Sequence, residues 1–249
     1  MYVDTLGLVL RENRYKESSK MLTVLTSTEG KISVAARGAM KKGSRIAAAS
    51  QLLAFSEMTL LNSRGRWVLT EARSVELFRG LRDDVEKLAL GSYFSELLET
   101  VSDEDSPDPA ILTLGLNAVY ALSESVKPDP IVKAAFELRL MCLAGFAPQL
   151  GACVSCGRED GAMALDLIGG AVLCADCAKH GGEDTAPLDP GALDAMRHIC
   201  TCPAKKLLSF TLGDASADRL CRAAEQYTLR QLDRSFQTLD FYKSLRYHP

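Results

Sequence analysis

The stretch KMLTVLTSTEGKISVAA, residues 20–36, decides the fold of the N-terminal part of the chain. It holds two short runs rich in Val, Leu, Ile and Thr with Glu29-Gly30 between them, a pattern typical of two β-strands joined by a turn. Similar runs lie on both sides of it: VDTLGLVL at 3–10, SEMTLL at 56–61 and RWVLTEARSVEL at 66–77. Five short strands within the first 80 residues predict a small closed β-barrel.

The segment between the third and fourth predicted strands narrows the kind of barrel. SRIAAASQLL at 44–53 is rich in Ala and predicts one short helix. Five strands with a helix after the third are in the order of an OB-fold.

From Leu81 onward the apolar residues take helical spacing. A first amphipathic helix over 81–101 is predicted from Val85, Leu88, Ala89, Ser92, Leu97 and Val101. Asp-Pro pairs predict helices that begin at Pro109, Pro130 and Pro190, because Asp accepts from free backbone N–H groups and Pro has none to leave unpaired. The second of these should end near Gly145, and a last helix should run from about Ala217 to Phe236.

The strongest chemical signal is a pair of Cys-x-x-Cys motifs, Cys153-Val-Ser-Cys156 and Cys174-Ala-Asp-Cys177, with 17 residues between them. Two such turns, joined by a hairpin that reverses at Gly169-Gly170, would supply four sulfurs at about 2.3 Å from one zinc ion. Free thiols or a redox pair are the alternatives, but a redox role does not need two pairs at this spacing. With four thiolates the zinc has no open position, which indicates a structural site.

The fold class predicted from these patterns is α+β. We expect an OB-fold domain at residues 1–80, then an α-helical domain at 81–249 with an inserted four-cysteine zinc finger at about 150–180. The other cysteines carry weaker signals. Cys142 and Cys221 are expected in the core, and Cys200-Thr-Cys202 is expected to be a pair of buried or idle thiols and not a second metal site.

Charge is distributed unevenly along a chain whose net charge is −3. Residues 1–80 hold 13 basic and 7 acidic side chains, whereas residues 81–249 hold 16 and 25. A basic domain joined to an acidic one indicates that one part meets a polyanion, although charge also varies between domains by chance. The sequence has no apolar run of 18 residues and no signal peptide behind MYVDTLGLVLREN, so we expect a cytoplasmic protein with reduced thiols and no membrane segment.

A basic cluster on the predicted barrel is the second chemical signal. Five of its members lie within 15 residues, and two more flank a later hairpin. Tyr15 is the best candidate for stacking on a base. The predicted DNA-binding set is Lys31, Arg37, Lys41, Lys42, Arg45, Arg64, Arg66 and Tyr15. Lys and Arg on flexible loops follow a phosphate backbone, and few aromatic residues are present, so binding should show little sequence preference. A solvated loop with ordinary positive charge is the alternative interpretation.

No catalytic motif stands out: the three histidines lie in no acid–base pattern, and there is no P-loop or G-x-S-x-G sequence. We therefore expect a protein that is not an enzyme. A zinc-ribbon interaction module acting in transcription or translation is the alternative. A zinc hydrolase or deaminase is disfavoured because all four ligands are cysteines and no glutamate stands beside them.

Along nearly its full length the chain resembles the bacterial recombination mediator family RecO. The matching stretches are GLVLRENRYKESSKMLTVLTSTEGKISVAARGA at 7–39, LLAFSEMTL at 52–60, LAGFAPQLGACVSCG at 143–157 and LDFYKSLRYH at 239–248. The resemblance implies an OB-fold that contacts DNA, a helical domain and, in members that keep the cysteines, a zinc finger. It also implies a nucleoid-associated protein that binds single- and double-stranded DNA and anneals complementary strands. With RecR, such a protein helps RecA to replace the single-strand-binding protein SSB.

A partner surface is expected near the C-terminus of the chain. Apolar residues and arginines alternate there, and Arg230 and Arg234 are the predicted contacts for the acidic SSB tail, which the resemblance implies as a ligand. The alternative is a core helix whose arginines pair with nearby Glu and Asp residues.

Overall fold

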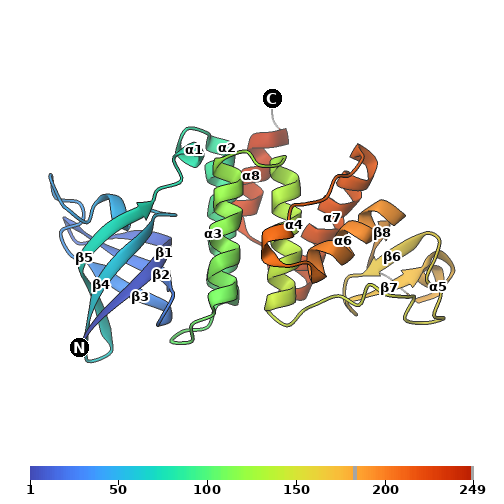
Figure 1. The fold of residues 1–249 in the computed structure, drawn as a ribbon, viewed down its shortest axis with the longest axis horizontal. Coiled ribbons are helices and arrows are strands. Elements are labelled where there is room, and N and C mark those ends of the chain that lie inside the picture. Colours follow the sequence, from blue (N-terminus) through green and yellow to red (C-terminus); the bar gives the residue numbers. More distant parts are fainter. Residues whose placement is uncertain (182–183, 248–249) are drawn as a thin grey trace. The chain divides into compact units, whose positions relative to one another are not determined.

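A computed structural model describes residues 1–181 and 184–247, and the chain folds into two compact units (Figure 1). One unit comprises Met1–Glu124 together with the C-terminal segment from Phe236, and the other comprises Ser125–Ser235. The first unit holds the barrel together with several helices, while the division of the chain at residue 80 stays a prediction. Over the described ranges, no helix is both long enough and apolar enough to span a membrane.

The first unit contains a closed five-stranded barrel, as predicted. Its strands are β1 (Tyr2–Tyr15), β2 (Ser19–Thr26), β3 (Gly30–Ala36), β4 (Phe55–Ser63) and β5 (Arg66–Glu76), in the order β1-β2-β3-β5-β4. A register shift between Val9 and Arg11 lets β1 pair with β4 through its first half and with β2 through its second half. A short parallel pairing of β3 with β5, at Val34 and Trp67, closes the barrel.

The segment between β3 and β4 is less helical than predicted. Only Ala48–Ser50 form a 3₁₀ turn, η1, and the rest of residues 44–53 is turns and bends. The turn is anchored because Ser50 donates its hydroxyl to the Ala47 carbonyl oxygen at 3.1 Å. The strand order with a short helical connection after β3 remains that of an OB-fold.

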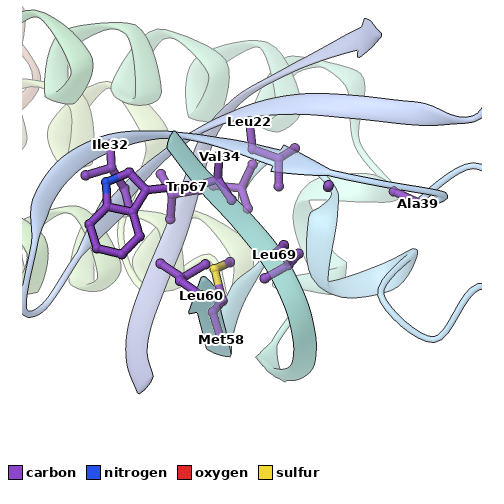
Figure 2. Close-up of a cluster of buried hydrophobic side chains, with 11 residues drawn as sticks. Leu22, Ile32, Val34, Ala39, Met58, Leu60, Trp67 and Leu69 are labelled. Carbon is purple, nitrogen blue, oxygen red and sulfur yellow. The ribbon is translucent and has the colours of Figure 1, made fainter. Parts of the chain in front are cut away.

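Alternating inward-facing side chains fill the barrel (Figure 2). Trp67 is 9% exposed and packs with Leu60, Met58 and Leu69, so this tryptophan belongs to the core of the barrel. Gly7 permits close packing of β1, since a Cβ there would lie 2.6 Å from Cγ1 of Val24.

The helices of the first unit are α1 (Arg79–Arg82), α2 (Val85–Val101), α3 (Pro109–Ser123) and α8 (Gln237–Tyr247). The predicted helix over 81–101 is thus two helices, because Asp84 caps α2 by accepting from the N–H groups of Glu86 and Lys87. The residues from which this helix was predicted are only partly the ones that it buries. Val85 is exposed, and the buried side chains include Tyr93, Phe94, Leu97 and Leu98.

The second unit contains α4 (Asp129–Leu143), α6 (Pro190–Thr201), the 3₁₀ turn η2 (Ala204–Lys206) and α7 (Asp214–Gln231). It also contains a small module of β6 (Met163–Asp166), β7 (Ala171–Cys174), α5 (Ala175–Gly181) and β8 (Thr185–Leu188), whose strands are ordered β7-β6-β8.

Some of the predicted starts and ends of the helices are confirmed and others are wrong. Asp108 caps α3 and Asp189 caps α6, as expected, but α4 begins at Asp129 with Pro128 at its N-cap. Gly145 follows α4 with a positive φ of 89°, which only glycine adopts readily. The last predicted helix, Ala217 to Phe236, is wrong in extent. The α7 helix ends at Gln231, Asp233 takes a φ of 45°, and α8 then forms a separate helix in the other unit.

Candidate nucleic-acid interface and metal centre

Two basic loops lie side by side at one end of the barrel. The N–H of Met40, in the loop after β3, donates to the Ser18 carbonyl oxygen at 2.9 Å, and the N–H of Gly38 donates to the Ser19 hydroxyl at 3.2 Å. These contacts join the loop of residues 37–45 to the β1–β2 turn. We call the exposed basic residues of both segments the basic loop pair: Arg14, Lys16, Arg37, Lys41, Lys42 and Arg45.

The basic loop pair has the properties that a phosphate-binding surface needs. Its side chains are exposed, and over the described residues no ion pair neutralises any of them. Tyr15 stands among them, 46% exposed, with the ammonium nitrogen of Lys16 at 5.3 Å from the ring centroid. A base stacked on Tyr15 would therefore have a cation beside it.

Lys31 is placed apart from the rest of the predicted DNA-binding set. It lies at the start of β3, whereas Arg37 follows the end of that strand. Its ammonium group donates to the carbonyl oxygen of Glu99 at 2.8 Å, and its N–H donates to the Asp103 carbonyl oxygen at 3.3 Å. A cation at the free carbonyls that end α2 is favourable, so the structure gives Lys31 a role in fixing α2 to the barrel.

Arg64 and Arg66 flank the turn between β4 and β5, and both are exposed. The turn is tight: Arg64 and Gly65 have φ of 53° and 76°, and the N–H of Gly65 donates to the side chain of Asn62 at 3.1 Å. Their joint action with the basic loop pair stays a prediction.

A cavity on the barrel is excluded as a DNA groove by its charge. It measures about 560 Å³ and is lined by Asp4, Thr5, Leu6, Ser27, Thr28, Glu57, Met58, Thr59, Glu71, Ala72 and Arg73. Arg73 is already held by both carboxylate oxygens of Glu57 at 3.0 Å, which leaves Asp4 and Glu71 to repel phosphate.

The four predicted metal-ligating cysteines lie together. The sulfurs of Cys153, Cys156, Cys174 and Cys177 are all within 4.8 Å of one another, and those of Cys156 and Cys174 are 3.7 Å apart. Residues 163–174 form the expected hairpin. Its turn closes where the N–H of Gly170 donates to the Asp166 carbonyl oxygen at 3.0 Å.

The loop that carries the first pair is joined to the hairpin by backbone hydrogen bonds. The N–H of Val154 donates to the Val172 carbonyl oxygen at 3.0 Å, and Gln149 exchanges hydrogen bonds with Gly170 and Val172. Gly157 has a φ of 74°, the positive value expected after the first Cys-x-x-Cys turn. The third strand, β8, was missed by the sequence analysis because its TAPL sequence carries little strand signal.

The electrostatics of this cluster favour a bound cation. The backbone N–H groups of Cys174 first, and then of Cys156 and Ser155, lower the pKa of the Cys153 thiol to about 6. The Cys174 pKa is also lowered, chiefly by the backbone N–H of Cys177. The side chain of Cys174, and then that of Cys156, instead raise the pKa of Cys177 to about 12. Two of the four sulfurs thus favour the thiolate form before any ion binds, and the group of four fits a thiolate-preferring metal ion.

The predicted partner residues lie at the end of α7. Arg230 is paired through its Nε with Asp184 at 2.9 Å, and Arg234 is exposed after the helix. The partner of Arg230 is thus not one of the acidic residues of the C-terminal segment. The assignment of Arg230 and Arg234 to a partner surface stays a prediction.

Comparison with known proteins gives a consistent result. A family model described as recombination protein O N terminal matches residues 1–78, and one described as recombination protein O C terminal matches residues 82–240. Two proteins named DNA repair protein RecO are similar over nearly all of both chains. The one from Symbiobacterium thermophilum is 32% identical over 96% of each, and the one from Acetivibrio thermocellus is 28% identical over 98% of this chain and 97% of its own. The RecO of Rubrobacter xylanophilus is 31% identical over 87% of this chain and 88% of its own.

Proposed function

This chain belongs to the RecO family of DNA repair proteins, and we propose that it acts as a recombination mediator that binds single- and double-stranded DNA and anneals complementary strands. The observation that carries the proposal is the basic loop pair on an OB-fold barrel, with the exposed ring of Tyr15 beside Lys16. In the cell we place it in the cytoplasm, associated with the nucleoid.

Annealing by such a surface rests on charge neutralisation. Two DNA strands repel each other through their phosphates, and cations that displace the condensed counterions lower that repulsion on any sequence. Tyr15 can stack a base without selecting it, which leaves the base edges free to pair. This work needs no catalytic residue and no nucleotide hydrolysis, in agreement with a sequence that shows no catalytic motif.

The cysteine cluster holds one zinc ion in this proposal, bound by Cys153, Cys156, Cys174 and Cys177. The four thiolates would fill a tetrahedral zinc, so the ion supplies cross-linking of the small module and no catalysis. The role is structural because the ion would join the loop that carries Cys153 and Cys156 to the segment that carries Cys174 and Cys177.

The partners implied by the family are RecR, RecA and the SSB tail, and this chain would bring RecA onto SSB-coated single strands together with RecR. We assign Arg230 and Arg234 to the SSB tail, whose acidic residues and terminal carboxylate suit guanidinium groups. Arg230 would exchange its ion pair with Asp184 for the peptide. A labelled tail peptide should lose at least tenfold in affinity for Arg230→Glu/Arg234→Glu, and unchanged affinity in the folded variant would remove this assignment.

The decisive experiment is strand annealing on SSB-coated complementary oligonucleotides. The wild-type chain should accelerate annealing, and Lys41→Glu/Lys42→Glu should abolish the acceleration. The matched control is Lys205→Glu/Lys206→Glu, an adjacent exposed lysine pair in the second unit with the same change in charge. Failure of the wild-type chain to anneal, or equal loss in both variants, would favour an interaction module of transcription or translation.

A further inference from the structure

The cavity of about 560 Å³ on the barrel, which we call the acidic hollow, is lined by the first half of β1, by β4 and β5, and by the turn between β2 and β3. The strand register places Asp4 opposite Thr59 and Thr59 opposite Glu71, so these three side chains form one row across the outer face. Thr59 donates its hydroxyl to Asp4 at 2.7 Å. Over the described residues, no ion pair neutralises Asp4 or Glu71, and both are exposed. The row therefore presents two free carboxylates to solvent.

The next row of the acidic hollow is an ion pair beside apolar surface. Leu6 lies opposite Glu57, and Glu57 lies opposite Arg73, which donates to both of its carboxylate oxygens at 3.0 Å. Leu6 is 38% exposed, and Met58, a member of the barrel core, also lines the cavity (Figure 2). Three acidic side chains and one arginine give the lining a net charge of −2. The acidic hollow therefore suits a cationic side chain that has an apolar stem.

Other classes of ligand fit the acidic hollow less well. Phosphate is repelled by Asp4 and Glu71. In the part of the chain that the structure describes, the four cysteines are the one group of side chains gathered closely enough to hold a metal ion. The hydroxyls of the cavity are already engaged, since Thr28 donates to Thr5 at 2.9 Å and Thr5 lies 3.2 Å from the Ser27 hydroxyl. A cation carried on a protein surface is the ligand that remains.

The chain itself carries such a surface in the basic loop pair. Its six cations are exposed and have no ion pair over the described residues, and the exposed ring of Tyr15 lies among them. A single copy cannot bring the two surfaces together. Asp4 and Arg14 are ten residues apart on β1, which is up to about 33 Å along a strand that the closed barrel holds in place.

We propose that the acidic hollow of one copy receives the basic loop pair of a second copy, and that DNA displaces the loops from it. Lysine and arginine side chains meet Asp4 and Glu71 in this contact, and the ring of Tyr15 lies against Leu6. Each copy has one acidic hollow and one basic loop pair, so the contact is heterologous and can repeat from copy to copy. It joins exposed charges, which makes it weak and sensitive to salt.

Release by DNA follows from charge density. A single strand presents a phosphate at every nucleotide, and its binding releases condensed counterions, whereas the acidic hollow offers a net charge of only −2. The DNA-binding surface is therefore covered by a neighbouring copy until a strand is present. Only this displacement step rests on the proposed function, because the contact between copies needs no DNA.

The test is sedimentation velocity of the full metal-loaded chain over a wide range of protein concentration. At low salt the weight-average sedimentation coefficient of the wild-type chain should rise with concentration, and high salt should abolish the rise. Asp4→Asn/Glu71→Gln should remove the rise at low salt. The matched control is Glu104→Gln/Asp105→Asn, an exposed acidic pair in the loop after α2 with the same change in charge, which should keep it.

A mixture of two variants tests the head-to-tail geometry directly. Asp4→Lys/Glu71→Lys has like charges on both surfaces, and so does Lys41→Glu/Lys42→Glu, so each should stay monomeric alone. Mixed together they should associate, because the basic loop pair of the first meets the acidic hollow of the second. Recovery in the mixture would also show that both variants are folded.

Three results would overturn the contact: a wild-type chain that stays monomeric at low salt, association that survives in Asp4→Asn/Glu71→Gln, or a mixture that stays monomeric. Oligothymidine added to the associated wild-type chain should disperse it into DNA-bound single copies. A chain that binds oligothymidine but stays associated would overturn the displacement step. A chain that associates but binds no oligothymidine would contradict the proposed function and, with it, the displacement step.

Discussion

Reversal of two charges on the basic loop pair should change the salt dependence of DNA binding by a calculable amount. Each phosphate neutralised on a single strand contributes about 0.7 to the slope of log K against log salt. If the six exposed cations of the pair each meet one phosphate, the wild-type slope is about −4.2, and Lys41→Glu/Lys42→Glu leaves a slope of about −2.8. A fourfold rise in salt then weakens wild-type binding by about 300-fold and the variant by about 50-fold.

The assay is fluorescence anisotropy of a labelled oligothymidine titrated with protein at several concentrations of potassium chloride. Lys205→Glu/Lys206→Glu supplies the control, since it makes the same change in net charge in the other unit and should keep the wild-type slope. Circular dichroism would confirm that both variants are folded. A slope that does not change in the loop variant, or that falls equally in the control, would refute the reasoning.

Lys31 offers a second comparison in the same assay. Its ammonium group donates to the Glu99 carbonyl oxygen and lies apart from the basic loop pair, so Lys31→Gln should keep the slope and lower the stability of the first unit. A slope reduced by about 0.7 would instead return Lys31 to the DNA-binding set.

Three further predictions concern the metal, the pH dependence and the barrel core. Cys153→Ser should lose the metal by elemental analysis and lower the melting temperature, while DNA affinity stays at the wild-type value because the barrel belongs to the other unit. The Tyr227 pKa is raised to about 12, so its contribution to stability is complete below the unfolded tyrosine pKa of about 10 and is lost as pH rises toward 12. In urea unfolding, the free energy of unfolding should therefore fall less between these two pH values in Tyr227→Phe than in the wild-type chain. Trp67→Ala should destabilise the barrel by about 3–5 kcal/mol in urea, and a loss below about 1 kcal/mol would contradict its place in the core.

Local patterns predicted most of the elements. Alternating apolar residues gave the five strands, because one face of each strand is buried in the barrel. Asp108 and Asp189 mark true helix starts, since capping depends on groups two or three residues away. At Asp129 the Asp-Pro signal predicted the start of the helix one residue too late. The helical periodicity of residues 81–101 predicted a single helix there, so the cap at Asp84 was not recognised.

The sequence by itself therefore determined features that depend on residues close together in the chain: the strands, the helix caps and the two Cys-x-x-Cys turns. The sulfurs of those two turns come together as their spacing predicts. Only the tertiary structure decided which distant residues meet. In the sequence Lys31 looks like one more cation of a basic cluster, yet its ammonium group donates to the carbonyl oxygen of Glu99, which is 68 residues away. Arg139 reaches the Cys200 carbonyl oxygen only because α4 packs against α6, and no local pattern encodes a contact between residues that the whole core must first bring together.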